Sequence, residues 1–318
     1  VQPSILDPMS VSLEHRARPW ACIVGAVLLT LATLSLTACG GSSNETSGAN
    51  FSTPEHIEQS AFHAEAAQSS NGASIDTSCT AAGYVGASAT NQQRLKFLIT
   101  SGQATYSYDL PQDGTAIICP LSFGDGAYSF RIMQNTSGDN YVELFSTTTT
   151  VELSSEYAPF TVPNVYCSYN DSSACVKKAR ELTRGAKNQG DAVESICEWI
   201  VNNVSYDNGK ASKLKQATGY VPNPDITLKS KKGICFDYAS LGAAMLRSVG
   251  IPTKIVTGYV SPDQIYHAWI MVYIDGTWKS AQFTVDKDTW SRVDLTFAAS
   301  GDSKNVGDGK EYTDRYVY

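Results

Sequence analysis

Gly233-Ile234-Cys235-Phe236-Asp237-Tyr238-Ala239 begins a segment that continues to Gly250 and decides the fold of the second half of the chain. From Cys235 onward the segment is apolar on nearly every side, which is typical of a buried helix. Gly250 is suited to end this helix, and Pro252 cannot continue it. The sequence therefore predicts a buried helix with a cysteine in its first turn.

Cys235 is a candidate nucleophile. The reactive form of cysteine is the thiolate, and the free N–H groups and dipole at a helix start favour that anion. The backbone N–H of Cys235 is also placed to stabilise an oxyanion. A purely structural cysteine is the competing interpretation, so the assignment depends on finding a partner base.

His267 is the candidate base, because it is the histidine in a segment expected to fold. It lies on a strand expected over residues 266–274, on the same face as Trp269 and Met271. A cysteine–histidine pair supplies the nucleophile and proton carrier of thiol chemistry. The other three of the four histidines are His15, His56 and His63, in the N-terminal leader and linker.

An aspartate is expected to orient the imidazole and to stabilise its charged form. Asp294 is the first candidate and lies on a strand expected over residues 290–297, beside the strand of His267. Asp288 and Asp286 are the alternatives.

The order of these residues resembles the core of the transglutaminase-like superfamily. The resemblance covers roughly residues 174–318 and implies a papain-like α+β fold, in which a helix bearing the cysteine packs on an antiparallel sheet. It implies a triad with Cys235 as nucleophile, His267 as general base and acid, and Asp294 as the orienting group. The family usually has proline where this chain has Leu295, which keeps Asp288 as an alternative. The matching motifs are Gly233-x-Cys235-x-Asp237-Tyr238-Ala239, Gly258-Tyr259, His267-Ala268-Trp269 and Asp294-Leu295-Thr296-Phe297, with Glu198-Trp199-Ile200, Tyr206-Asp207 and Leu246–Pro252 around them.

Two aromatic residues are candidates for binding substrate. Trp269 and Tyr206 lie next to the motif residues and are expected to line the pocket, with core packing as an equal alternative for both. Asp237 is expected to be structural, as a negative charge near a helix N-terminus.

The N-terminus carries the pattern of a secretory signal. Basic residues precede an apolar run over 20–38, and small residues lead to Cys39. This ending resembles the lipobox of bacterial lipoproteins, which implies cleavage before Cys39, lipid attachment to its sulfur, and an extracytoplasmic protein on the cell surface. An uncleaved membrane anchor is the alternative.

The rest of the chain is expected to form three regions. Residues 39–78 are rich in Ser, Gly, Asn and Ala and predict a flexible linker. Residues 79–165 alternate in short runs separated by turn signals, which predicts a small all-β sandwich of immunoglobulin-like size. Residues 166–318 form the catalytic domain, in which one helix is expected to begin at Asp191 as N-cap.

Composition limits the classes of ligand. The formal net charge of −7 argues against nucleic acid, because phosphate binding requires a basic face. No metal, nucleotide or flavin motif is present, so no cofactor is expected.

The remaining cysteines allow two disulfides, Cys167–Cys175 and Cys79–Cys119, as possible pairings. Cys197 is expected to be a core residue.

The sequence thus predicts an enzyme that acts on peptide or carboxamide bonds through a Cys235 thioester. Water would make it a protease or amidase and an amine would make it a crosslinking transferase, with hydrolysis favoured outside the cell. The expected partners are a peptide or protein substrate, including cell-wall peptide, and the membrane that holds Cys39. The alternative is a non-catalytic binding or adhesion lipoprotein that keeps the fold. A solute-binding lipoprotein fits the anchor but not the triad.

Overall fold

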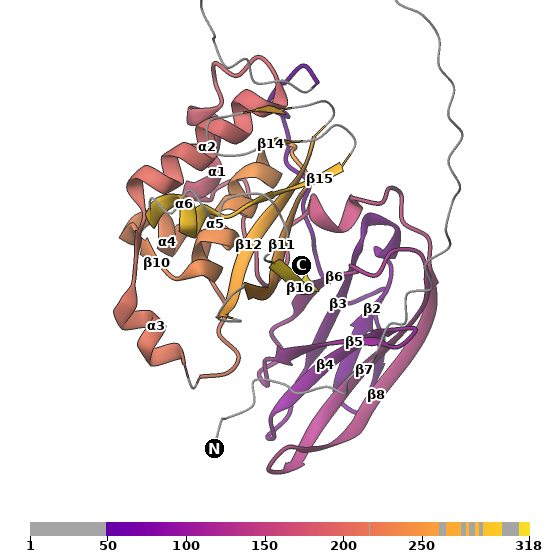
Figure 1. Cartoon of the computed structure of the whole chain (residues 1–318). Helices are drawn as coiled ribbons and strands as arrows, with labels where there is room; N and C mark the ends of the chain where they lie inside the picture. Colours follow the sequence, from indigo (N-terminus) through magenta and orange to yellow (C-terminus); the bar gives the residue numbers. More distant parts are fainter. Residues whose placement is uncertain are drawn as a thin grey trace, which may run out of the picture. The chain divides into compact units, whose positions relative to one another are not determined.

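The computed structural model describes residues 49–318 except 216, 261–264, 275–277, 280–283, 286–288 and 301–311. The expected signal at 1–38, Cys39 and the alternatives Asp286 and Asp288 lie outside the described residues. Over the described ranges, none of the helices combines the length and apolar character needed to cross a membrane. The chain has the expected α+β fold, with antiparallel sheets first and a core of helices and sheet after them (Figure 1).

Two four-stranded antiparallel sheets build the N-terminal part, in the orders β1-β2-β3-β6 and β5-β4-β7-β8. Alternate residues of a strand point to the same side, so Leu95, Phe97 and Ile99 of β4 are buried together. They share one apolar core with Ile75 and Val85 from the other sheet. The strands are β1 (Gln68–Ser70), β2 (Ala73–Asp76), β3 (Tyr84–Ala89), β4 (Leu95–Ser101), β5 (Ala104–Leu110), β6 (Ile117–Pro120), β7 (Gly126–Ser137) and β8 (Asn140–Val151), with short 3-10 helices η1 (Thr80–Ala82) and η2 (Ala158–Phe160).

Residues 49–78 are folded, and here the structure departs from the flexible linker expected over 39–78. Their second half forms β1 and β2, while Ile57 is buried among the helices of the C-terminal part. Ser60 donates a hydrogen bond from Oγ to the backbone oxygen of Pro163 at 2.8 Å. Backbone pairing and a few buried apolar side chains, including Ile57 and Ile75, hold this polar segment, and these few do not produce a long apolar periodicity.

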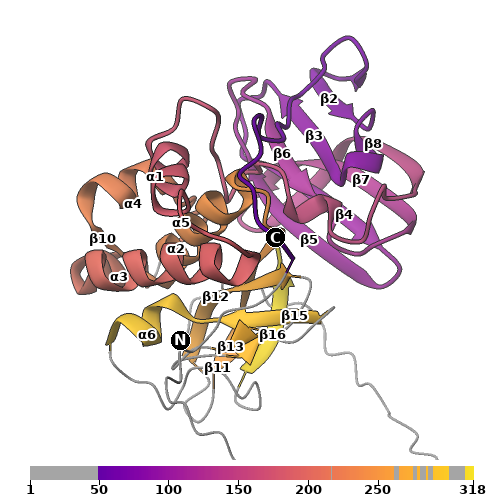
Figure 2. The same cartoon turned by 90° about the horizontal axis from the view of Figure 1, so that it is seen from above.

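The C-terminal part packs helices against a four-stranded antiparallel sheet of order β15-β12-β11-β16 (Figure 2). Helix α5 lies against β11 and β12 and is buried along most of its length. A Cβ on its Gly242 would lie 2.7 Å from Leu295 Cδ1, so this glycine permits the close approach of neighbouring elements. The elements are α1 (Ala174–Leu182), α2 (Gln189–Asn203), β9 (Ser205–Tyr206), α3 (Asn208–Leu214), α4 (Pro224–Ser230), β10 (Lys232–Gly233), α5 (Cys235–Ser248), β11 (Thr253–Val260), β12 (Ile265–Ile274), β13 (Trp278–Lys279), β14 (Thr284–Val285), β15 (Thr289–Val293), α6 (Leu295–Ser300) and β16 (Tyr312–Val317).

Two element boundaries differ from those expected. Helix α2 has Asn188 as its N-cap, because the Asn188 side chain accepts the Asp191 N–H at 2.9 Å. Asp191 instead accepts the backbone N–H of Lys187 at 2.8 Å. The strand expected over 290–297 ends at Val293, and Asp294 then leads into α6.

The cysteines of the described residues are free thiols, so neither Cys167–Cys175 nor Cys79–Cys119 is bridged. Cys167, Cys175 and Cys197 are buried in the same apolar core, where they act as small hydrophobic side chains. The expectation for Cys197 is therefore confirmed.

Arg247 ties three distant backbone segments together at the end of α5. It is only 3% exposed, and its guanidinium donates to the carbonyl oxygens of Thr253 at 2.8 Å, Val162 at 2.8 Å and Tyr318 at 2.9 Å. Its fork of donors thus joins α5 to the chain leaving the β-sheets and to the last residue.

We expect Arg247→Met to lower the free energy of unfolding by about 3–5 kcal/mol, because each buried carbonyl left without a donor costs about 1–3 kcal/mol. Urea denaturation measures this loss. The exposed Arg184, changed to Met, is the control and should shift stability by no more than about 0.5 kcal/mol. A loss under about 1 kcal/mol for Arg247→Met would contradict the role given to it.

Candidate active site

Cys235 is the first residue of α5 and is partly exposed. The residue before it, Ile234, is the N-cap, so Cys235 lies in the first turn of the helix, at the positive end of its dipole. Gly233 pairs with Tyr206 in the short parallel β10–β9 ladder. A Cβ on Gly233 would lie 2.6 Å from Asp237 Cβ, so glycine is required at this tight entry to the helix.

His267 lies on β12, directly opposite Gly258 of β11, and is 6% exposed. Its Nε2 is hydrogen-bonded to Asp294 Oδ2 at 2.9 Å. This bond occupies Nε2, so Nδ1 is the ring nitrogen left to exchange a proton with Cys235, whose sulfur also interacts with this imidazole. The structure thus brings together the three residues that the sequence singled out.

Asp294 is buried between β15 and α6, with 2% of its surface exposed. Besides His267, its Oδ2 accepts a hydrogen bond from the hydroxyl of Tyr312 at 3.0 Å. Its Oδ1 accepts the backbone N–H of Thr296 at 3.1 Å, which caps the start of α6. The carboxylate is therefore held at both oxygens.

Tyr312 is a site residue that the sequence analysis missed. It lies on β16, which pairs with β11 on the side away from β12. The Tyr312 hydroxyl contacts Asp294, and the Tyr312 ring packs edge-on against the ring of Trp269, with 4.9 Å between the ring centroids. A tyrosine in an alternating strand near the end of the chain carries no local signal of such a contact.

The charge state of His267 follows from its two neighbours. Burial by itself lowers the pKa of a histidine, but hydrogen bonds to Asp294 and Cys235, together with the negative charges of both, raise the pKa of His267 to about 10. The imidazole therefore carries its proton at neutral pH. The arrangement provides a nucleophile with an adjacent proton donor.

The two aromatic candidates occupy different environments. Trp269 is 1% exposed and stacks on His267 with ring centroids 6.4 Å apart, which fits its packing alternative. Tyr206 is 44% exposed, and burial together with the negative charges of Cys235 and Asp237 raises its pKa. Its ring is therefore both near the nucleophile and accessible to a ligand.

No cluster of three or more histidine, cysteine, aspartate or glutamate side chains suited to a metal ion occurs in the described parts of the chain. The chemistry that these residues support is that of the thiol, the imidazole and the carboxylate.

The chain is similar to one known protein family and to several individual proteins. Residues 176–295 match the family model described as the transglutaminase-like superfamily. UPF0252 protein MJ1282 of Methanocaldococcus jannaschii is 30% identical over 125 residues, which are 36% of this chain and 34% of that protein. Kyphoscoliosis peptidase of Mus musculus is 30% identical over 108 residues, or 31% of this chain and 16% of the peptidase.

Among solved structures, a candidate cysteine protease from Cytophaga hutchinsonii is 18% identical, with a TM-score of 0.40 over 73% of each chain. The chain spans well under half the length of the two relatives described above.

The raised pKa of His267 makes stability depend on pH. The folded state binds the His267 proton more tightly than the unfolded chain does. The contribution of this proton to the free energy of unfolding is therefore complete below the ordinary pKa of 6.5 and is lost as the pH rises through about 10. We expect the stability difference between the unmodified chain and His267→Gln to shrink across this window. Urea titrations at constant ionic strength measure it, and a difference that stays constant from pH 6 to 10.5 would contradict the raised pKa.

Proposed function

We propose that the chain is a cysteine hydrolase that cleaves peptide or carboxamide bonds through an acyl-thioester on Cys235. The observation that carries this proposal is the position of His267, which is hydrogen-bonded to Asp294 through Nε2 and interacts with Cys235 as well. One imidazole joined to a thiol and a carboxylate is the arrangement that activates cysteine nucleophiles.

In the first half of the reaction the Cys235 sulfur attacks the carbonyl carbon and a C–S bond forms. The carbonyl oxygen becomes an oxyanion, which the backbone N–H of Cys235 and the start of α5 stabilise. His267 then transfers its proton to the departing nitrogen, the C–N bond breaks, and an amine leaves. The product is a thioester and a neutral imidazole.

Water completes the reaction. His267 removes a proton from the water as the oxygen attacks the thioester carbon. The C–S bond breaks, the acid product leaves, and the thiolate–imidazolium pair is restored. An amine in place of water would give transfer instead. The mouse and human relatives are named peptidases, which supports the hydrolytic outcome.

The substrate that we propose is a peptide or protein, including a cell-wall peptide. The exposed Tyr206 next to Cys235 is suited to contact a peptide segment beside the scissile bond. We further propose that the chain is exported and held at the cell surface through a lipid on Cys39, which would give the enzyme extracytoplasmic substrates.

Thiol labelling tests the nucleophile without knowledge of the substrate. We expect iodoacetamide to alkylate Cys235 rapidly at pH 6, and His267→Ala to slow this reaction by about 100-fold or more, because the thiolate loses its partner. Peptide mass spectrometry follows Cys235 and, as an internal control, the partly exposed Cys79. Slow labelling of Cys235 that ignores His267 would favour the non-catalytic binding module.

Two conservative changes separate the roles around Asp294. We expect Asp294→Asn to reduce kcat/KM on a hydrolysed peptide about 100-fold or more, because the imidazolium loses its anion. Tyr312→Phe removes one hydrogen bond and is expected to reduce kcat/KM about tenfold, the equivalent of about 1.4 kcal/mol. The melting temperature is measured beside both. Equal activity of Tyr312→Phe and the unmodified chain would show that Tyr312 does not position Asp294.

A further inference from the structure

A second carboxylate lies at the nucleophile's end of α5. Asp237 follows Cys235 by two positions and is 0% exposed. Its Oδ2 accepts the backbone N–H of Ile234, the residue before Cys235, at 2.8 Å. Asp237 therefore caps the helix and holds the backbone from which the nucleophile projects.

The same carboxylate creates an electrostatic difficulty for Cys235. A buried charge is strongly unfavourable unless it is paired. A negative charge two residues along the same helix also opposes the formation of a second one on the sulfur. The negative charges of both Cys235 and Asp237 raise the pKa of Tyr206, which pairs through its backbone with Gly233 just before them.

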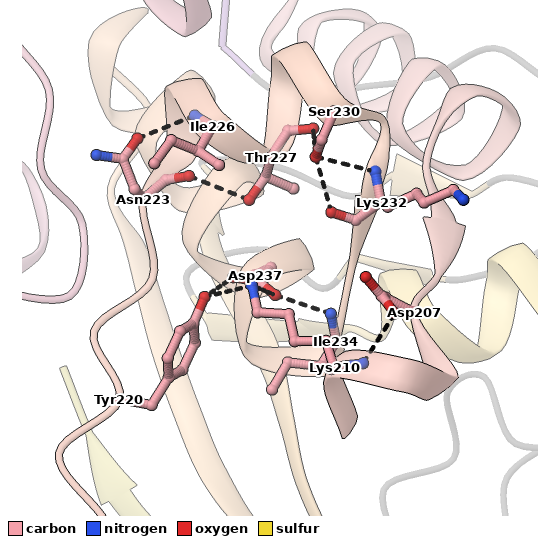
Figure 3. Close-up of polar contacts among 10 residues, drawn as sticks. All are labelled: Asp207, Lys210, Tyr220, Asn223, Ile226, Thr227, Ser230, Lys232, Ile234 and Asp237. Atoms are coloured by element: carbon pink, nitrogen blue, oxygen red, sulfur yellow. Dashed lines mark hydrogen bonds and ion pairs between the residues drawn. The ribbon is translucent and has the colours of Figure 1, made fainter. Parts of the chain in front are cut away.

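Lys210 and Tyr220 supply the compensation. Lys210 Nζ donates to Asp237 Oδ2 at 2.6 Å and to the Tyr220 hydroxyl at 2.5 Å, and it lies 4.6 Å from the centre of the Tyr220 ring. The Tyr220 hydroxyl donates to Asp237 Oδ1. Figure 3 shows both side chains converging on the carboxylate.

Tyr220 remains a hydrogen-bond donor rather than an anion. Burial and the charge of Asp237 both raise the pKa of its hydroxyl. The net charge of the cluster at neutral pH is therefore that of one lysine and one aspartate, which cancel.

Local structure directs Lys210 to this place. Asp207 donates its backbone N–H to Gly233 O at 2.9 Å, and its side chain accepts the Lys210 N–H at 2.9 Å as the N-cap of α3. The first turn of α3 is thus fixed to the strand that leads into Cys235. Lys210 is partly exposed, at 28%, and so extends from the surface to a fully buried partner.

We propose that Lys210 is a positioning residue for the nucleophile, which neutralises Asp237 so that this helix cap does not oppose the negative charge of Cys235. The inference rests on the proposed function, since it concerns the reactivity of the same thiol. The titratable groups that interact with Cys235 are His267 from β12 and Tyr206 from β9. Those that interact with Asp237 are Lys210 from α3, Tyr220 and Tyr206.

The test is the pH dependence of Cys235 alkylation by iodoacetamide, measured on the full chain by peptide mass spectrometry. We expect Lys210→Met to raise the apparent pKa of the thiol by about one unit, because Asp237 is left uncompensated. Asp237→Asn should lower it by a similar amount, because Lys210 then acts on the sulfur alone. The double variant Lys210→Met/Asp237→Asn should return close to the pH profile of the unmodified chain. Lys210→Arg keeps the positive charge and should also give a profile close to that of the unmodified chain.

The exposed Lys213 on the same helix, changed to Met, is the matched control and should leave the profile unchanged. Melting temperatures identify variants that fail to fold. If Lys210→Met is one of them, the double variant, which has no unpaired buried charge, is compared with Asp237→Asn in its place. A folded Lys210→Met with the unmodified profile overturns the inference, as does an Asp237→Asn profile that does not move.

The two proposals fail separately. If His267→Ala abolishes rapid labelling but Lys210→Met and Asp237→Asn leave the profile unchanged, the active site stands and the role of Lys210 is wrong. If His267→Ala has no effect, the proposed function fails, whatever the Lys210 variants do. Opposite shifts for Lys210→Met and Asp237→Asn, cancelling in the double variant, support the inference.

Discussion

The imidazole of His267 is buried and nevertheless carries a raised pKa, because it lies between a carboxylate and a thiol that both stabilise its proton. Burial without those neighbours would have the opposite effect. The rest of the C-terminal part serves this arrangement: α5 presents the sulfur, β12 presents the ring, and the end of β15 presents Asp294. Displacement of any one element would leave a charged group buried without its partner, which is strongly unfavourable.

The same constraint explains other polar contacts of the core. Asp237 is buried at the start of α5 with Lys210 and Tyr220, and Arg247 is buried near its end against three carbonyl oxygens. Each end of the helix that carries the nucleophile is thus fixed by a buried charged group that makes several hydrogen bonds. Such groups specify one arrangement more strongly than apolar packing does, because an alternative arrangement leaves them unsatisfied.

Local patterns predicted the elements that hold the two central residues. The apolar run before Gly250 predicted α5 with Cys235 in its first turn, and strand alternation predicted β12 with His267. The linker expectation failed for residues 49–78 because backbone pairing in β1 and β2 requires little apolar surface. The alternation of Leu295 and Phe297 predicts a strand after Asp294, where the structure has a helix. The capping hydrogen bond from the Thr296 N–H to Asp294 depends on the three-dimensional structure and leaves no mark in that alternation.

By itself the sequence determined the chemical types at the site, the helix and strand that carry Cys235 and His267, and the order of the motifs. These depend on composition and on periods of two and of 3.6 residues, which are local properties. Tertiary structure alone decided that Nε2 of His267 faces Asp294, that Tyr312 from the last strand completes the site, and that Lys210 neutralises Asp237. Those contacts join residues from separate elements, and their geometry follows from sheet order and helix packing, which no local pattern encodes.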